Sequence, residues 1–284
     1  MDNQRRTFNN LTAVTKGELS MAITDIKIKK HVETFMSEDD FIKLLQIKMS
    51  AKMITPNIPL IKAALELAIV GHKNQLRDDG TPYIYHCINT ARILVEEFGI
   101  LDIDMIIAAL LHDLIEDVDE LYRQLTSPES LRALFGDNVA NLVAGASKPR
   151  KTDPRFASDS ERHKYFFDRI RYYKEKKEWG VWLIFLKLVD RLHNMRNIHH
   201  CRPEKRARKI KETIDIYLPM VEAIGHIDEK YANYLRHELL EAIEIANAVP
   251  ADKLGPPLAT DPAATTGSAA ASTATGQTKN PAQH

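Results

Sequence analysis

The sequence predicts an all-α protein built around a single helical domain. Apolar residues recur with helical spacing along most of the chain, and no stretch shows a convincing strand alternation. With 284 residues, of which 44% are hydrophobic, the chain can bury one full-sized core. We expect this domain over residues 57–249, between an N-terminal extension (1–56) and a disordered tail (250–284).

The N-terminal extension is expected to contain one short helix. A capping pattern of Ser37 with Asp40 precedes an amphipathic segment over residues 41–47, which is a candidate appendage to the domain. Beyond Pro56 and Pro59, the apolar spacing predicts the helices of the domain. They are expected over residues 61–72, 84–98, 103–117, 131–147, 160–177, 181–198, 203–224 and 229–248.

The tail and the bulk composition limit the function classes. Residues 262–284 contain no large aliphatic side chain, which is typical of disorder and leaves no room for a second catalytic module. Lys plus Arg and Asp plus Glu each number 39, so the chain lacks the basic field that favours a nucleic-acid partner. Two cysteines and the shortness of every apolar run favour a soluble cytoplasmic protein without a membrane partner.

The most informative segment is an apolar helix, residues 108–117, that ends in four ionisable side chains. Glu116 lies at i+4 from His112, and Asp117 lies at i+4 from Asp113, so both pairs can face one pocket. Acids at a helix C-terminus oppose the macrodipole, which argues against a merely solvated helix end. Because buried ionisable groups need a metal or a counter-charge, we interpret this segment as part of a metal-dependent hydrolytic centre.

A second segment, residues 181–195, adds a buried polar stripe to an otherwise apolar helix. Four polar residues share one helical face at i, i+3, i+7 and i+10: Lys187, Asp190, Asn194 and Asn197. A buried Asp190 needs a metal or a cation, and an ion pair with Lys187 or Arg191 explains it as well as a metal does. Three nearby histidines are out of phase with the stripe and are expected to pack or to lie at the surface: His193, His199 and His200.

A third segment supplies a second imidazole. Asp79-Gly80 and Pro82 mark a turn, and His86 lies in the first turn of the helix that follows. A lone histidine there is usually structural. Together with the His-Asp pair at 112–113 and with Asp190, however, it completes a set of two imidazoles and two carboxylates, whose mixed N and O donors suit Mn, Fe or Zn better than Ca.

In this order, these segments resemble the HD-domain phosphohydrolases, and specifically the (p)ppGpp hydrolase domain of the RelA/SpoT family. The resemblance covers residues 61–248. The matching segments are His72 to His86, Ala108 to Asp117, Phe135-Gly136 through Val143 to Ser147-Lys148, Leu186 to Arg196, and Glu212 to Pro219. His112-Asp113 followed by Glu116-Asp117, with the second motif around Asp190 at a fitting distance, makes the resemblance specific.

The resemblance implies an activity and a role for each site residue. The implied reaction releases pyrophosphate from the ribose 3′ position of guanosine tetra- or pentaphosphate and leaves GDP or GTP, without synthetase activity. It implies that one Mn²⁺ is held by four ligands: His86, His112, Asp113 and Asp190. Glu116 and Asp117 would orient or deprotonate the attacking water. The implied substrate contacts are Arg77 against the base, Asn194 at the ribose or 3′-phosphate, and the stripe residues Lys187 and Asn197.

The substrate loop departs from the family pattern, and this keeps alternatives open. Arg77-Asp78-Asp79-Gly80 stands where the family has Arg-Lys-Ser-Gly, and an Asp at position 78 should weaken phosphate binding unless it points away or pairs with a cation. Asn197 replaces a Thr and Cys87 replaces a Pro. The alternatives are a (p)ppApp hydrolase, a broader HD nucleotide phosphohydrolase, and a catalytically silent alarmone-binding protein. The presence of Glu116 and Asp117 argues against the last.

Overall fold

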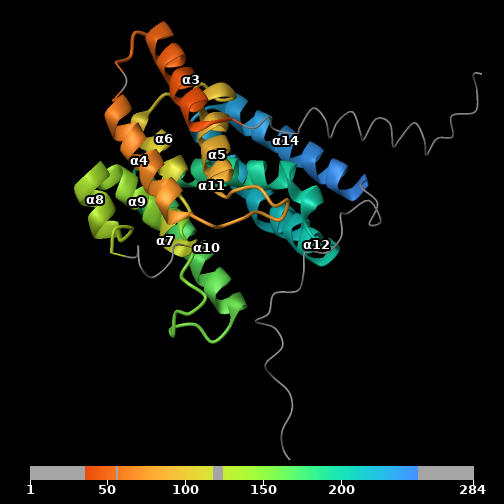
Figure 1. The fold of residues 1–284 in the computed structure, drawn as a ribbon. Helices are drawn as coiled ribbons and strands as arrows, with labels where there is room; N and C mark the ends of the chain where they lie inside the picture. The colour runs from red at the N-terminus through yellow and green to blue at the C-terminus, as the bar shows by residue number, and fades with distance from the viewer. Residues whose placement is uncertain (1–35, 56, 118–123, 249–284) are drawn as a thin grey trace, which may run out of the picture. The chain divides into compact units, whose positions relative to one another are not determined.

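Helices are the regular elements of this protein, as its periodicity predicts. The computed structural model describes residues 36–55, 57–117 and 124–248, except the side chain of Asp117. Apart from one isolated bridge between Leu76 and Pro82, all regular structure in these residues is helical (Figure 1), which confirms the all-α fold. The contacts divide the chain into two units, Met1–Leu254 and Gly255–His284, and the second lies outside the described residues, as does the tail expected over 250–284.

The described helices follow one another along the chain. Their bounds are α3 (Glu38–Ala51), α4 (Ile58–Gly71), α5 (Ile84–Glu96), α6 (Ile103–Leu111), α7 (Leu114–Asp117), α8 (Pro128–Phe135), α9 (Asp137–Ala146), α10 (Asp159–Lys176), α11 (Gly180–Arg196), η2 (Ile198–His200), α12 (Pro203–Glu212), η3 (Thr213–Tyr217), α13 (Leu218–Met220), η4 (Val221–His226) and α14 (Glu229–Ala248). Several begin at a side-chain cap. In α3, for example, the Asp40 N–H donates to Ser37 Oγ, as the capping pattern predicts.

Three of the long predicted helices are interrupted in the structure. Gly136, at φ +90°, separates α8 from α9, because few residues other than glycine adopt this backbone conformation. A turn at His112-Asp113 separates α6 from α7. The segment predicted over 203–224 changes from α-helix to the π-helical η3 and then, after Pro219, to the 3-10 helix η4.

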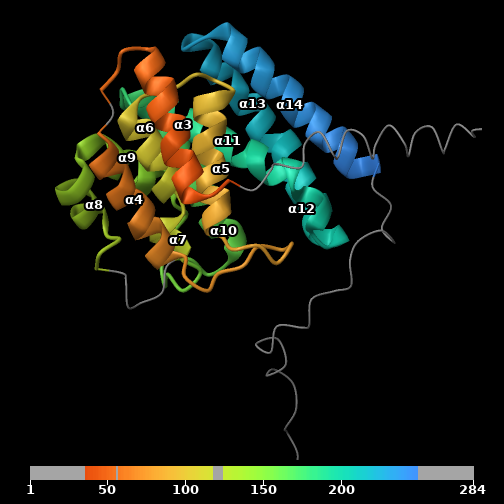
Figure 2. The ribbon, with the colours of Figure 1, turned by 45° about the horizontal axis from the view of Figure 1, so that its top comes forward.

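The helix α11 forms the centre of the hydrophobic core. It contacts α5, α6, α9, α10 and α14. Figures 1 and 2 show α8 and α9 on one side of it and α12 and α14 on the other. Fully buried side chains such as Phe185 and Leu188 each stabilise this arrangement by roughly 1.5–3 kcal/mol. Most polar side chains of α11 are therefore buried among the neighbouring helices.

The N-terminal helix α3 shares this core. Its apolar face, with Phe41, Leu45 and Met49 fully buried, contacts α4 and α5. The division of the chain at 56/57 and 249/250 stays a prediction. No helix within the described residues has the length and apolar character that crossing a bilayer requires.

Candidate metal centre

Four potential metal ligands from three parts of the chain meet in the interior. His86 lies in the first turn of α5, His112 and Asp113 form the turn between α6 and α7, and Asp190 lies in the middle of α11. The break after α6 explains the position of the His-Asp pair, because both side chains can turn inward where a continuous helix would separate them by about 100°. The structure thus brings together all four residues that the sequence analysis named as ligands.

The four side chains point their donor atoms at one spot. One ligand atom from each residue lies within 4.8 Å of those of the other three. The Nε2 atoms of His86 and His112 are 3.1 Å apart. The Oδ2 atom of Asp113 lies 3.0 Å from His112 Nε2, and the Oδ1 atom of Asp190 lies 3.2 Å from His86 Nε2. Two imidazole nitrogens and two carboxylate oxygens in this arrangement fit a divalent metal ion.

Neighbouring groups fix the orientation of each ligand. His112 Nδ1 lies 2.8 Å from the Ala109 carbonyl oxygen, which places the ring proton on Nδ1 and leaves Nε2 free to bind a metal. His86 Nδ1 lies 2.6 Å from Nδ1 of the buried His193. The hydroxyl of Tyr83 donates to Asp113 Oδ2 at 2.6 Å.

Asp190 has its own pair of donors. Lys187 Nζ donates to its Oδ2 at 2.7 Å, and the Asn194 amide donates to its Oδ1 at 2.6 Å. The ion pair between Lys187 and Asp190, considered as an alternative to a metal ligand, is therefore present together with the ligand cluster. The polar stripe along α11 orients Asp190 toward the histidines.

The electrostatics of the cluster favour a positive charge at its centre. Burial lowers the pKa of His112, but the carboxylates of Asp113 and Asp190 outweigh burial and raise it to about 10. Burial, with the charge of Arg77 in addition, lowers the pKa of His86 to about 4. Both carboxyl groups have pKa values far below the usual range, because the nearby cations outweigh the effect of burial. The donor set thus passes both a geometric and an electrostatic test for a bound cation.

Glu116 lies next to the cluster, on α7. Its Oε2 accepts a hydrogen bond from the Lys148 backbone N–H at 3.1 Å, and its Oε1 lies 3.6 Å from the Arg162 guanidinium. Burial raises the pKa of Glu116 despite the opposing charge of Lys148. Asp117, the predicted companion of Glu116, ends α7, and its side chain lies outside the described residues.

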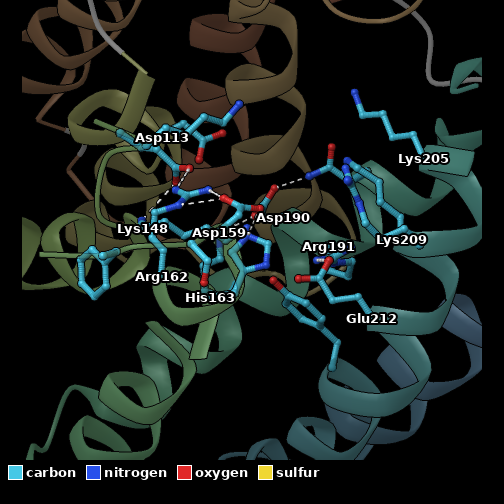
Figure 3. A pocket seen from close by; sticks show the side chains of 18 of the residues that line it. Asp113, Lys148, Asp159, Arg162, His163, Asp190, Arg191, Lys205, Lys209 and Glu212 are labelled. Atoms are coloured by element: carbon cyan, nitrogen blue, oxygen red, sulfur yellow. Dashed lines mark hydrogen bonds and ion pairs between the residues drawn. The ribbon is translucent and has the colours of Figure 1, made fainter. Parts of the chain in front are cut away.

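A cavity of about 700 Å³ opens over the cluster. Asp113, Glu116 and Asp190 line it, and so does Tyr217, which the π-helical η3 carries. Figure 3 shows Lys148 and Arg162 on the α10 side and Lys205 and Lys209 on the α12 side. The cavity therefore combines the carboxylates of the centre with a cationic rim, which suits a phosphorylated substrate.

A smaller cavity of about 170 Å³ adjoins the large one. Arg77, Asn194 and Asn197 line it, and Arg77 lies 3.4 Å from the Asn194 amide oxygen. The predicted substrate-binding residues are thus divided, since Lys187 lines the large cavity, Asn197 the small one and Asn194 both. The ammonium of Lys187 is directed at Asp190.

The altered loop is held against α12. Lys205 Nζ lies 2.7 and 2.9 Å from the two carboxylate oxygens of Asp78, and the Cys201 thiol donates to Asp78 Oδ2 at 3.0 Å. Burial raises the pKa of Asp78, but the hydrogen bonds from Lys205 and Cys201 outweigh burial and hold it below the usual value. The acid at position 78 therefore pairs with a cation, which is one of the two arrangements expected to make it tolerable.

Sequence reasoning missed several residues around the centre. His193 was expected to pack or to lie at the surface, and it is buried against His86. Arg162, Lys205 and Lys209 reach the cavity from α10 and α12, whose charged sequences resemble any solvated helix. Lys148 was the exception, because it is the last residue of one of the family segments.

An all-α domain with a buried His-Asp pair, a second His and a distant Asp defines a class of metal-binding helical domain. Within this class, the chain belongs to the HD domain family, whose family model matches residues 64–226. This confirms the family resemblance inferred from the motifs.

Curated relatives of the chain include much longer proteins. A GTP pyrophosphokinase of Myxococcus xanthus is 38% identical over 170 residues, which are 60% of this chain and 21% of that protein. A guanosine-3′,5′-bis(diphosphate) 3′-pyrophosphohydrolase of Vibrio cholerae is 36% identical over 170 residues, 60% of this chain and 22% of that protein. The bifunctional (p)ppGpp synthase/hydrolase SpoT of Escherichia coli is 36% identical over 59% of this chain and 22% of its own length. The chain thus matches about a fifth of the length of these relatives.

A solved structure shares the fold. It is described as a metazoan ortholog of SpoT that hydrolyses ppGpp, and it superimposes with a TM-score of 0.52 at 24% identity. The match covers 69% of this chain and 99% of that one. At this level of identity, the likeness supports the helical fold alone.

Proposed function

We propose that the protein hydrolyses the 3′-pyrophosphate of guanosine tetra- or pentaphosphate, releasing pyrophosphate and leaving GDP or GTP. The observation that carries the proposal is the convergence of His86, His112, Asp113 and Asp190 beneath a cavity with a cationic rim, with Glu116 beside them. The Vibrio cholerae relative is named for this reaction, and the segment that matches it includes the family domain. Hydrolysis without synthesis stays a prediction, as does action in the cytoplasm without a nucleic-acid partner.

The metal is proposed to be one Mn²⁺, held by the four donors of the cluster. Mixed imidazole and carboxylate ligands suit Mn²⁺. When bound, a divalent ion lowers the pKa of a coordinated water and neutralises phosphoryl oxygens. The remaining steps depend on the residues around it.

Glu116 is proposed to accept the proton of the attacking water. Its raised pKa makes its carboxylate a stronger base than an exposed one, and the Lys148 N–H and Arg162 hold it in place. Asp117 is proposed to assist in orienting the water. The water oxygen bonds to the phosphorus next to the ribose, the bond from this phosphorus to the 3′ oxygen breaks, and the 3′ oxygen takes up a proton.

The remaining predicted contacts divide between the two cavities. Asn194 is proposed to meet the ribose or the 3′-phosphate, because it lines both cavities beside Asp190. Arg77 and Asn197 line the smaller cavity and are proposed to bind the base side. Lys187 is proposed to act through Asp190, to which it donates, and to add positive charge to the large cavity.

An adenosine alarmone is the second candidate substrate. It is favoured by Asp78 and Asp79, which alter the loop that lines the smaller cavity. A product assay decides between the candidates: metal-loaded protein is incubated with guanosine and adenosine tetraphosphates, and the products are separated by chromatography. Pyrophosphate with GDP or with ADP identifies the base preference. Orthophosphate as the released product would contradict the proposed reaction and favour a broader nucleotide phosphohydrolase, and binding without turnover would favour an alarmone-binding protein.

A further inference from the structure

Two lysines on α12 face the active-site cavity in different electrostatic states. Lys205 and Lys209 are four residues apart, so they share one face of the helix and repel each other. Lys205 is neutralised by Asp78, both of whose carboxylate oxygens lie within 3 Å of its ammonium. Among the residues that the structure describes, none forms an ion pair or hydrogen bond with the ammonium of Lys209, whose backbone carbonyl accepts from Thr213 Oγ1.

The side chain of Lys209 is nevertheless partly buried. It lines both cavities, and it projects from α12 opposite Lys148 and Arg162 in Figure 3. Burial, followed by repulsion from Arg191 and Lys205, lowers the pKa of Lys209 to about 8. A partly buried cation without an ion-pair partner is unfavourable in the ligand-free protein, and an anion beside it would relieve this cost.

The position of Lys209 indicates which anion this is. The large cavity contains the centre where a phosphate ester would be cleaved, and the smaller one contains Arg77. Lys209 and Asn194 stand where the two cavities adjoin, so a group between the cleaved phosphates and the base lies beside them. In a nucleoside 3′,5′-bis(diphosphate), that group is the ribose with its 5′-diphosphate.

We propose that Lys209 binds the 5′-diphosphate, the phosphate group that the enzyme does not cleave. The inference rests on the proposed function. Because the Lys205 ammonium is already paired with the Asp78 carboxylate, Lys209 supplies the cation for this phosphate from the adjacent turn of α12. Lys209 is in this way a specificity residue that distinguishes doubly phosphorylated nucleosides from those phosphorylated at the 3′ position alone.

The test compares two probes in equilibrium binding to metal-loaded protein. They are guanosine 3′,5′-bis(diphosphate) and guanosine 3′-diphosphate, measured by calorimetry in a Glu116→Gln background so that neither is consumed. Protein with Lys209 should bind guanosine 3′,5′-bis(diphosphate) more tightly than guanosine 3′-diphosphate. Lys209→Met should reduce the ratio of the two affinities about tenfold, as expected for one charge-assisted contact. Lys209→Arg should retain it. Lys211→Met is the matched control, because Lys211 lies on the same helix but is exposed and paired with Asp215.

Three results would overturn the assignment of Lys209. Lys209→Met could weaken the binding of both probes equally, which would place the side chain at the cleaved phosphates or make its effect one of general cavity charge. The substitution could leave the affinity for both probes unchanged. The parent protein could bind both probes with the same affinity. Pyrophosphate release by protein that retains Glu116, together with any of these results, leaves the proposed function intact. Conversely, a Lys209-dependent preference with no pyrophosphate release by protein that retains Glu116 overturns the reaction alone. Without ligand, the unfolding temperature of Lys209→Met should equal or exceed that of the parent protein. This result would show that the variant is folded and that its weaker binding does not come from unfolding.

Discussion

At the scale of single residues, Glu116 is the most direct test of the chemistry. Glu116→Gln keeps the shape and the acceptor oxygen for the Lys148 N–H but cannot accept a proton. We expect the turnover rate to fall by about 10²–10⁴-fold, the usual contribution of a positioned base, while Mn²⁺ and substrate still bind. Turnover and metal binding are measured in parallel. Glu129→Gln, an exposed acid at the start of α8, is the control. Unchanged turnover in Glu116→Gln would assign the proton to another group.

The pKa of Lys209 predicts how stability changes with pH. A pKa of about 8 in the folded protein lies below the ordinary 10.5, so the unfolded chain binds more protons between these values. The penalty of the charged Lys209 is therefore fully present below pH 8 and is relieved as the pH rises from about 8 toward 10.5. Urea unfolding of the parent and of Lys209→Met at pH 7 and pH 9.5 measures this. The advantage of Lys209→Met should shrink at the higher pH, and a constant difference would contradict the prediction.

Sequence reasoning reached the four residues that cluster in the interior but not their surroundings. These four side chains are ionisable groups in apolar helices. Burying a charge is unfavourable without a partner, so an ionisable residue within an apolar helical pattern stands out in a sequence. The orienting contacts are different. The contact between His193 and His86 joins residues 107 positions apart, and the helical phase of His193 gave no sign of it. The cationic rim comes from α10 and α12, where charged residues are common for many reasons.

At the scale of elements, the close approach of α10 and α11 depends on Gly180. A Cβ atom at Gly180 would lie 2.1 Å from the Tyr173 carbonyl oxygen of α10. This oxygen belongs to the helix backbone, which cannot shift as easily as a flexible side chain. Gly180→Ala should shift the start of α11 and lower the free energy of unfolding by about 1–3 kcal/mol, the usual effect of overpacking. Urea unfolding measures this. Gly225→Ala is the control, since its Cβ would meet nothing within 4 Å. Equal stability of the two variants would show that α11 adjusts without cost.

The elements themselves were predictable where their periodicity was unbroken. The last helix, 229–248, has the predicted bounds, and α11 begins one residue before its predicted start. The breaks were harder to predict. Gly136 interrupts an apolar pattern that continues through both α8 and α9, and the turn at His112-Asp113 leaves the period almost unchanged. Such breaks depend on where the tertiary structure needs a change of direction, and the hydrophobic pattern records only which residues are buried.

At the scale of the whole molecule, the proposed metal should contribute to folding stability. A ligand that binds only the folded state stabilises it by about 2.7 kcal/mol when its concentration is 100 times its Kd. Chelation should therefore lower the unfolding temperature, and Mn²⁺ should restore it. His86→Ala should abolish the Mn²⁺ response. His237→Ala is the control, because the exposed His237 belongs to another His-carboxylate group, in which Glu238 is already paired with Arg196. Loss of the response in both variants would contradict the assigned ligand set.

The two adjoining cavities have a further consequence for the choice of substrate. Tyr83, Asn194 and Lys209 line both cavities, so the candidate metal centre and the recess beside Arg77 lie on either side of a shared wall. If the proposed function holds, we expect selection by size. A compound as short as inorganic pyrophosphate would contact the centre alone, whereas a nucleoside with phosphates on both sides of its ribose would contact both cavities.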